Sequence, residues 1–440
     1  MKIFSLIVIG IFFFFGILAC QNANSKKKTV ASKLTDEQLM DTVQKQTFKY
    51  FWDFADSASG MAKERNTEIM ITSGGSGFGI MAIVVGVERG YITREAALER
   101  MLKIVNFLEK AERFHGAWPH WLFGETGKPK HFSQYDDGGD LVETAYLVQG
   151  LLTAKEYFNQ ENEAENELRK KITYLWETVE WDWYRQNDQN VLYWHWSKNY
   201  GWKMNMPIRG WNECLITYVL AASSPTHPVP AEVYHEGWTN SNHFYNGNEY
   251  EGIKLPLGFP YGGPLFFTHY SFLGLNPNGL KDQYADYFEL NSNQSLINFK
   301  YCVKNPKGFP GYSDSCWGLT ASDDPYHFYL AHEPGSDRDN GTISPTAAIS
   351  SIVYTPKESM QAMRYFFEEL GDSLWGEYGF YDAFNLDANW TADTYLAIDQ
   401  GPIVVMIENY RTGLLWNNFM KNKDVQNGLT KLGFTYKTTD

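Results

Sequence analysis

Two kinds of helix alternate along this chain, and that alternation limits the folds open to it more than any other feature. Amphipathic segments, each with one apolar stripe, are predicted at 36–57, 93–114, 161–179, 230–241, 281–305 and 356–370. Each is followed by a segment that is apolar on almost every side, at 77–90, 140–158, 210–223, 262–275, 344–354 and 399–420.

A helix that is hydrophobic on all sides must be covered on all sides. Six buried helices inside six amphipathic ones form an (α/α)6 barrel, which is the all-α fold we expect. An irregular helical domain is the alternative. A doubly wound sheet is disfavoured, because the sequence has no βα alternation and no series of valine-rich strands. In the barrel, the loops that lead into the inner helices converge at one end.

The N-terminus has the pattern of an export signal. Lys2 precedes a short apolar run that ends in "ILAC" at Cys20, which is typical of a secretory signal and short for a membrane span. "ILAC" resembles a bacterial lipobox, so Cys20 is the predicted lipidation site and residues 1–20 the lipoprotein signal peptide. An ordinary signal peptide or anchor is the alternative. Polar residues 21–34 would form a flexible tether, followed by one domain over 35–440.

Composition restricts the partners. The net charge is −14 and there is no basic stripe, which argues against nucleic acid. Cys214, Cys302 and Cys316 fit no zinc spacing, and we expect no metal and no cofactor. The membrane would be contacted through the lipid anchor alone. For a Gram-negative source this predicts a periplasmic outer-membrane lipoprotein, and we expect a monomer.

Aromatic residues make up 16% of the chain, and many tryptophans lie beside Gly, Pro, His or Asn, which are loop residues. Rings with polar edges suit sugars, because they bury area while their polar atoms stay paired. Core packing could explain part of the set equally well. Arg338 lies in "SDRDNG", where a sugar-contact loop is favoured over a calcium loop. The candidate binding residues outside the acidic motifs are Trp118, His120, Trp196, Arg209, Trp211, Trp317 and Arg338.

Carboxylates gather where the apolar helices begin. In "YDDGGDLVETA" (135–145), Asp136, Asp140 and Glu143 have the spacing of one helical face. Glu213 and Asp399 occupy the corresponding place on two other inner helices. Acids near a helix N-terminus also act as ordinary caps, which explains one or two of them. Paired acids beside aromatic loops are the groups that cleave a glycosidic bond: one protonated acid and one ionised base or nucleophile.

Several motifs together resemble a known family: "YDDGGDLVETA", "RGWNE" (209–213), "CWGLTASD" (316–323), "YGFYDAF" (378–384) and "AIDQGP" (397–402). They are similar to glycoside hydrolase family 144, bacterial glucoamylase-like proteins that act on β-1,2-glucans and their oligosaccharides. The resemblance covers the chain from about residue 35. It implies an (α/α)6 barrel, inverting hydrolysis and no metal.

By the same resemblance, Glu213 would be the general acid and Asp399 the base, with Asp136, Asp140 and Glu143 around the scissile sugar. An apolar setting should raise the pKa of Glu213, whereas Asp399, before "QGP", is expected to be ionised. Two other classes stay open. A lipid-anchored glycan-binding protein would not need paired acids, and a polysaccharide lyase of this fold would need a positive cleft. The motifs leave endo and exo cleavage undecided.

Overall fold

The computed structural model describes residues 33–437. The predicted signal peptide, Cys20 and all of the tether up to residue 32 lie outside the described residues. The described residues from Asp36 onward form one compact unit. Within the described residues, no helix is both long and apolar enough to cross a membrane.

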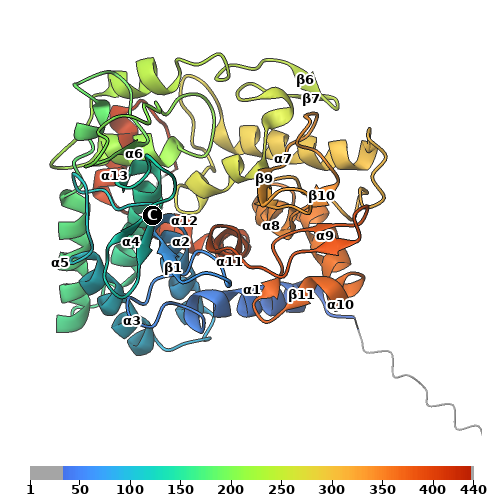
Figure 1. Cartoon of the computed structure of the whole chain (residues 1–440), viewed down its shortest axis with the longest axis horizontal. Coiled ribbons are helices and arrows are strands. Elements are labelled where there is room, and N and C mark those ends of the chain that lie inside the picture. Colours follow the sequence, from blue (N-terminus) through green and yellow to red (C-terminus); the bar gives the residue numbers. More distant parts are fainter. Residues whose placement is uncertain (1–32, 438–440) are drawn as a thin grey trace, which may run out of the picture. The chain divides into compact units, whose positions relative to one another are not determined.

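The compact unit is built from helices in the predicted order. The α-helices are α1 (Asp36–Trp52), α2 (Ser73–Glu88), α3 (Arg94–Leu108), α4 (Leu141–Tyr157), α5 (Glu163–Glu177), α6 (Leu215–Ser223), α7 (Tyr287–Lys304), α8 (Pro345–Ser350), α9 (Pro356–Glu368), α10 (Gly371–Leu374), α11 (Ala397–Thr412), α12 (Leu414–Phe419) and α13 (Lys423–Lys431). In Figure 1, α2 and α11 lie toward the middle of this unit, and α3 and α5 lie at its edge. The fold is the expected (α/α)6 barrel.

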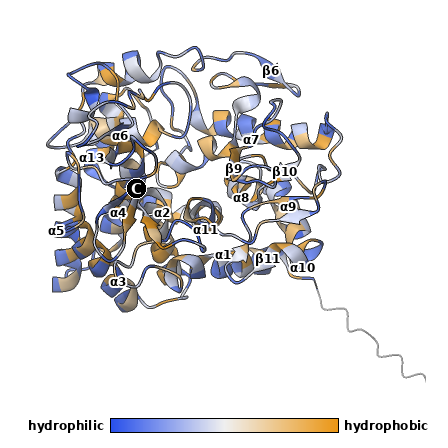
Figure 2. Cartoon of the chain, viewed as in Figure 1, coloured by the Kyte–Doolittle hydropathy of each residue, from blue (hydrophilic) through white to orange (hydrophobic). Residues whose placement is uncertain are grey.

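The inner helices α2 and α4 cross at glycines. All residues from Ser73 to Gly86 are buried, as are those from Leu141 to Ala154. A Cβ on Gly77 would lie 2.1 Å from the carbonyl oxygen of Tyr146, and one on Gly150 would lie 2.2 Å from that of Gly77. Only glycine allows the two backbones to approach this closely. Both helices are covered on all sides, as their sequences predicted. By contrast, α5 carries hydrophilic and hydrophobic residues side by side, as Figure 2 shows.

Two inner helices are broken, where the sequence predicted continuous ones. The predicted helix 262–275 consists of the short 3-10 helices η4 (Leu265–Thr268) and η5 (Tyr270–Phe272). They follow Gly262 and Gly263, both at positive φ, and Pro264, which has no N–H to donate. The predicted helix 344–354 is α8 followed by η6 (Ser351–Val353). The helix predicted at 399–420 ends early, because Gly413 adopts a left-handed C-cap between α11 and α12.

The fourth outer helix also differs from the prediction. Segment 230–241 contains a six-residue π-helical stretch, η2 (Val233–Trp238), instead of an α-helix. Two further 3-10 turns are η1 (Trp183–Arg185) and η3 (Pro260–Gly262). The three described cysteines, Cys214, Cys302 and Cys316, are buried free thiols.

Short antiparallel strands, which the sequence did not predict, lie in the loops. The pairings are β1 (Met70–Thr72) with β2 (Trp121–Phe123), β2 with β3 (Pro129–Lys130), β4 (Gly139–Asp140) with β5 (His195–Trp196), β6 (Glu249–Tyr250) with β7 (Ile253–Lys254), β8 (Ala321–Asp323) with β9 (Tyr329–Ala331), β10 (Thr342–Ile343) with β13 (Phe384–Asn385), β11 (Trp375–Gly376) with β12 (Gly379–Phe380), and β13 with β14 (Trp390–Thr391). Strands β1, β4 and β10 lead directly into α2, α4 and α8. They fix the backbone at the end of the barrel where the predicted acids lie.

Candidate active site

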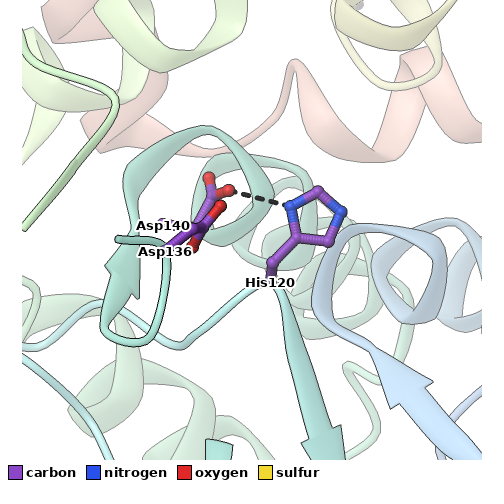
Figure 3. Close-up of side chains that lie close together, drawn as sticks. All are labelled: His120, Asp136 and Asp140. Carbon is purple, nitrogen blue, oxygen red and sulfur yellow. Dashed lines mark hydrogen bonds and ion pairs between the residues drawn. The ribbon is translucent and has the colours of Figure 1, made fainter. Parts of the chain in front are cut away.

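Asp140 is the centre of a buried cluster at the start of α4. One carboxylate oxygen accepts hydrogen bonds from the backbone N–H groups of Val142 (3.0 Å) and Glu143 (2.9 Å) and so caps the helix. The other is hydrogen-bonded to His120 Nδ1 at 3.0 Å, as drawn in Figure 3, and accepts from the indole N–H of Trp194 at 3.1 Å. The side chain has no exposed surface. Asp140 therefore holds the site together, and its assignment to substrate binding stays a prediction.

Glu143 ties α4 to the start of α2. Its Oε2 accepts from the backbone N–H of Gly74 at 2.7 Å and from the Thr72 hydroxyl at 3.2 Å. Its Oε1 lies 4.0 Å from His120 Nε2. Burial raises the pKa of Glu143, and the nearby His120 opposes that rise. A Cβ on Gly74 would lie 2.6 Å from Glu143 Oε2, so a larger residue at that position would displace the Glu143 carboxylate.

His120 carries a positive charge among these acids. Burial disfavours the charge, but Glu143 and the hydrogen-bonded Asp140 outweigh it and raise the pKa of His120 to about 9. Asp136 lies close by, and burial together with the charge of Asp140 raises its pKa to about 7. The Asp136 carboxylate is also 3.5 Å from Nε2 of the buried His195.

One ligand atom from each of His120, Asp136 and Asp140 falls within 4.8 Å of the others, a spacing that could hold a metal ion (Figure 3). Both oxygens of Asp140 already accept hydrogen bonds from N–H groups. A protonated imidazole also has no lone pair to offer a metal. The contacts are therefore those of an ion-paired cluster.

Glu213 lies in the turn just before α6, one position outside the helix cap. Its backbone carbonyl accepts from the hydroxyls of Ser271 and Tyr146. Burial raises the pKa of its carboxyl to about 7, the direction predicted from its apolar surroundings. A carboxyl with that pKa is protonated about half the time at neutral pH, which a general acid requires.

Asp399 lies in the first turn of α11, as predicted, but it is not an isolated carboxylate. Only 3% of the residue is exposed. Burial, the charge of Asp382 and a hydrogen bond to that residue raise the pKa of Asp399 well above its ordinary value. The direction of this shift runs against the expected ionised Asp399, and one of its causes, the acidic neighbour Asp382, was not predicted. Burial also raises the pKa of Asp382, to about 7.

A buried ion pair supports this second cluster. The Arg65 guanidinium lies 3.1 Å from the Asp323 carboxylate and 2.9 Å from that of Glu64. The backbone N–H of Asp323 donates to Asp382 Oδ2 at 2.7 Å. Asp323 and Asp382 were missed as individual site residues because they lie on or beside loop strands and not at the start of an inner helix. The only sequence signal for them was their place in "CWGLTASD" and "YGFYDAF".

Tyr270 connects the two predicted catalytic acids. Burial raises the pKa of its hydroxyl, and the charges of Asp399 and Glu213 both add to that rise. Its ring packs against Phe78 and Tyr146, with centroid distances of 5.3 and 5.7 Å. Glu213 and Asp399 thus lie near one tyrosine that forms part of the barrel interior.

Three of the predicted sugar-contact tryptophans belong to the core. Trp118, Trp211 and Trp317 are each 0% exposed. Their indole N–H groups donate to Leu108 O at 3.4 Å, Gln294 Oε1 at 3.2 Å and Glu358 O at 3.2 Å, respectively. The loops that contain them fold inward, so that the rings pack and their single donors are satisfied internally. Their assignment to substrate binding stays a prediction.

Trp196 remains a candidate, in a group of aromatic rings with His115 and Trp183. It is half-buried on β5, and its ring meets that of His115 edge-on at 4.8 Å. His115 stacks on Trp183, which is 40% exposed. Phe132, 49% exposed, stacks on His120 at 4.2 Å. Trp183 and Phe132 were not predicted, although their exposed rings are better placed for a sugar than the buried tryptophans.

The two predicted arginines differ in setting. Arg209 is half-buried and donates to Asn240 O at 3.3 Å. Arg338 is 57% exposed at its side chain and lies 3.8 Å from the Glu333 carboxylate. Its neighbour Asp339 is buried and accepts from the hydroxyls of Tyr301 and Tyr312. The assignment of Arg209 and Arg338 to substrate binding stays a prediction.

Comparison with known proteins places this geometry in a family. Residues 205–423 match the family model Glycoamylase, described as "Putative glucoamylase". A solved structure from Bacteroides uniformis, described in the same words, is 59% identical, with a TM-score of 0.90 over 92% of this chain and 98% of that one. The endo-β-1,2-glucanase of Chitinophaga pinensis, solved with sophorotriose and glucose, is 56% identical, with a TM-score of 0.90 over 92% of this chain and 99% of that one.

The chain belongs to glycoside hydrolase family 144. The exo-β-1,2-glucooligosaccharide sophorohydrolase (non-reducing end) of Parabacteroides distasonis is also similar, with 49% identity over 435 residues and 93% of this chain. This chain spans 60% of the length of that protein. The family 144 resemblance seen in the motifs is thus confirmed.

Proposed function

We propose that this protein is a glycoside hydrolase that cleaves β-1,2-glucan or β-1,2-glucooligosaccharides with inversion of the anomeric configuration. The observation that carries the proposal is the position of two carboxyl groups at the starts of inner helices, Glu213 before α6 and Asp399 in the first turn of α11. Both lie near Tyr270 in the barrel interior, and the pKa of Glu213 is about 7. Family membership supports the linkage, since relatives with endo and exo names share β-1,2 specificity.

In the proposed reaction, the Glu213 carboxyl gives its proton to the glycosidic oxygen as the bond to the anomeric carbon breaks. A water molecule attacks the opposite face of the sugar, and the cluster around Asp399 takes up its proton. Inverting enzymes need this division between a protonated acid and a proton acceptor. Incubation with linear β-1,2-glucan, its short oligomers, and β-1,3- and β-1,4-glucans as controls, followed by chromatography, tests the proposal. Cleavage of the controls alone would refute it.

A narrow pH optimum near 7 is expected for kcat/KM. The activity should fall as the pH rises through about 7, because Glu213 then loses the proton that it must donate. It should also fall on the acid side, because the Asp382 carboxyl, whose pKa is about 7, is then protonated and the cluster can accept no proton. Initial rates from pH 5 to 9 on a β-1,2-linked oligomer measure both limbs. A rate that still climbs beyond pH 8 would contradict the acid role of Glu213.

Trp196→Ala is expected to raise KM for long oligomers or to change product lengths, with the fold intact. The half-buried ring of Trp196 lies beside His115, where stacking on a sugar would contribute about 1 kcal/mol. Trp118→Ala is the contrasting variant: it removes a fully buried ring and should lower the melting temperature. Loss of folding in Trp196→Ala with unchanged products would show that this ring belongs to the core too.

We further propose that Cys20 is lipidated and anchors the enzyme, as a monomer, at the periplasmic face of the outer membrane. The "ILAC" sequence at Cys20 supports this. Metabolic labelling with a tagged fatty acid should mark the wild-type protein and not Cys20→Ala. Label retained by the variant would refute lipidation at that residue, and removal of the protein by protease treatment of intact cells would refute the orientation.

A further inference from the structure

Asp382 and Asp399 each have one buried oxygen that lacks a hydrogen-bond donor. Among residues 33–437, Asp382 Oδ1 and Asp399 Oδ2 have no partner that donates to them. Both residues are 3% exposed, and each carboxyl group is close enough to shift the pKa of the other. Two ionised carboxylates cannot hydrogen-bond, because neither has a donor. A single proton held between the two residues supplies the donor that both oxygens lack.

The backbone fixes this pair from two sides. The Gln400 side chain, on the same helix as Asp399, donates to Phe380 O at 2.9 Å. The N–H of Asp382 donates to Thr394 O at 3.0 Å. The second oxygen of Asp382 accepts from the N–H of Asp323 at 2.7 Å. The Asp382 carboxyl therefore has a defined orientation, with Oδ1 left for its partner.

Charged and titratable groups surround the pair. Asp323, on β8, raises the pKa of both carboxyls, and Arg65, paired with Asp323 and Glu64, lowers it. Three tyrosine hydroxyls also lie near the pair. In addition to burial, the charges of Asp399 and Asp382 raise the pKa of Tyr270 and Tyr329, and the charge of Asp382 raises that of Tyr50. The hydrogen bond between the pair raises the pKa of Asp399 and lowers that of Asp382. A single proton would therefore be shared by the two carboxyl groups, with Asp399 as its favoured holder.

We propose that the base in the hydrolysis is the Asp382–Asp399 pair acting as one unit, with Asp382 as the positioning residue that works through Asp399. This inference rests on the function proposed above. As the water oxygen bonds to the anomeric carbon, one water O–H bond breaks and its proton goes to Asp399, which passes its own proton to Asp382. The glycosidic C–O bond breaks, and its oxygen takes the proton of Glu213. One proton leaves the acid and one enters the pair, so the step balances.

The test is a double-mutant comparison on a β-1,2-linked oligomer. Asp382→Asn keeps the acceptor for Asp323 N–H but cannot receive a proton, so it should lower kcat at least about 100-fold with little change in KM, as should Asp399→Asn. Because the two residues form one unit, kcat of the double variant should be no more than about threefold lower than kcat of the less active single variant. If the two losses multiply, or if Asp382→Asn keeps wild-type kcat, the pair is refuted. A wild-type protein that cleaves no β-1,2-glucan refutes the proposed function instead.

Gln400→Leu is the matched control. It removes the bond that holds segment 380–382 against α11 but leaves both carboxyls. We expect a loss in kcat of less than about tenfold that multiplies with the loss in Asp399→Asn, as independent effects do. If Gln400→Leu matches Asp382→Asn in every property, Asp382 acts only by holding this segment in place.

A second measurement needs no turnover and no change at Asp382. A carboxyl whose pKa is raised in the folded state favours folding while it is protonated, and that contribution is lost as the pH rises through the raised pKa. The melting temperature of the wild type should therefore fall relative to that of Asp399→Asn between pH 5 and 8. A difference that stays constant over this range would show that the pair holds no proton and would overturn the proposal.

Discussion

Glu213→Gln is expected to lower kcat at least about 100-fold and to change KM less than about threefold. Glutamine keeps the shape of the side chain and loses its proton, so the leaving oxygen would depart without an acid. Substrate contacts are not removed, because the backbone of residue 213 stays fixed through the Ser271 and Tyr146 hydroxyls. Steady-state kinetics at pH 7 on a β-1,2-linked oligomer give both constants.

Two comparisons make the Glu213 result specific. Glu161→Gln changes a carboxyl that is 87% exposed on the outer surface and should leave kcat within about twofold, since surface substitutions have small effects. A substrate with a good leaving group needs less help from an acid and should lose less activity in Glu213→Gln than the natural oligomer. Wild-type turnover in Glu213→Gln would exclude it as the acid and favour Asp136, whose pKa is also about 7.

Asp140→Ala is expected to destabilise the protein by about 3–5 kcal/mol, the usual cost of removing one partner of a buried ion pair. The change deletes the cap of α4, leaves the charged His120 without its nearest carboxylate and leaves the Trp194 indole N–H without an acceptor. Chemical and thermal unfolding followed by circular dichroism measure the loss.

Asp140→Asn separates the contributions of Asp140. The amide oxygen of asparagine can still cap α4, so we expect the free energy of unfolding to fall less than with alanine. The loss that remains measures the contribution of the Asp140 charge next to His120. If Asp140→Ala unfolds at the wild-type midpoint but loses substrate affinity, the residue contacts sugar after all. The structural assignment of Asp140 would then be wrong.

The helices were predictable because the spacing of apolar residues along the sequence shows which sides of each helix are buried. Segments apolar on every side became α2 and α4, and the amphipathic segment 161–179 became α5. Breaks within helices were not predictable in the same way. Residues 265–272 are as apolar as the intact inner helices, yet they form only 3-10 turns after Gly263 and Pro264, because tertiary packing decides whether such a segment continues.

The acids at helix starts were found because their position is unusual for a charge. Glu213 and Asp399 both lie near Tyr270, as expected for one barrel end. Asp382 was missed because a contact between a loop residue and a helix residue 17 positions later leaves no periodic signal. The burial of Trp118, Trp211 and Trp317 was not predictable for a related reason. Neighbouring Gly and Pro predict a loop, but not whether the ring points to solvent or to the core.

The most direct test of the account is proton NMR of the sugar released in the first minutes of β-1,2-glucan cleavage. Glu213 on one side and the Asp382–Asp399 pair on the other lead to attack by water with inversion. The account therefore predicts that the α-anomer appears first at the newly formed reducing end and then mutarotates toward equilibrium. Initial release of the β-anomer would contradict it, because retention requires a covalent intermediate that a proton-accepting pair does not form.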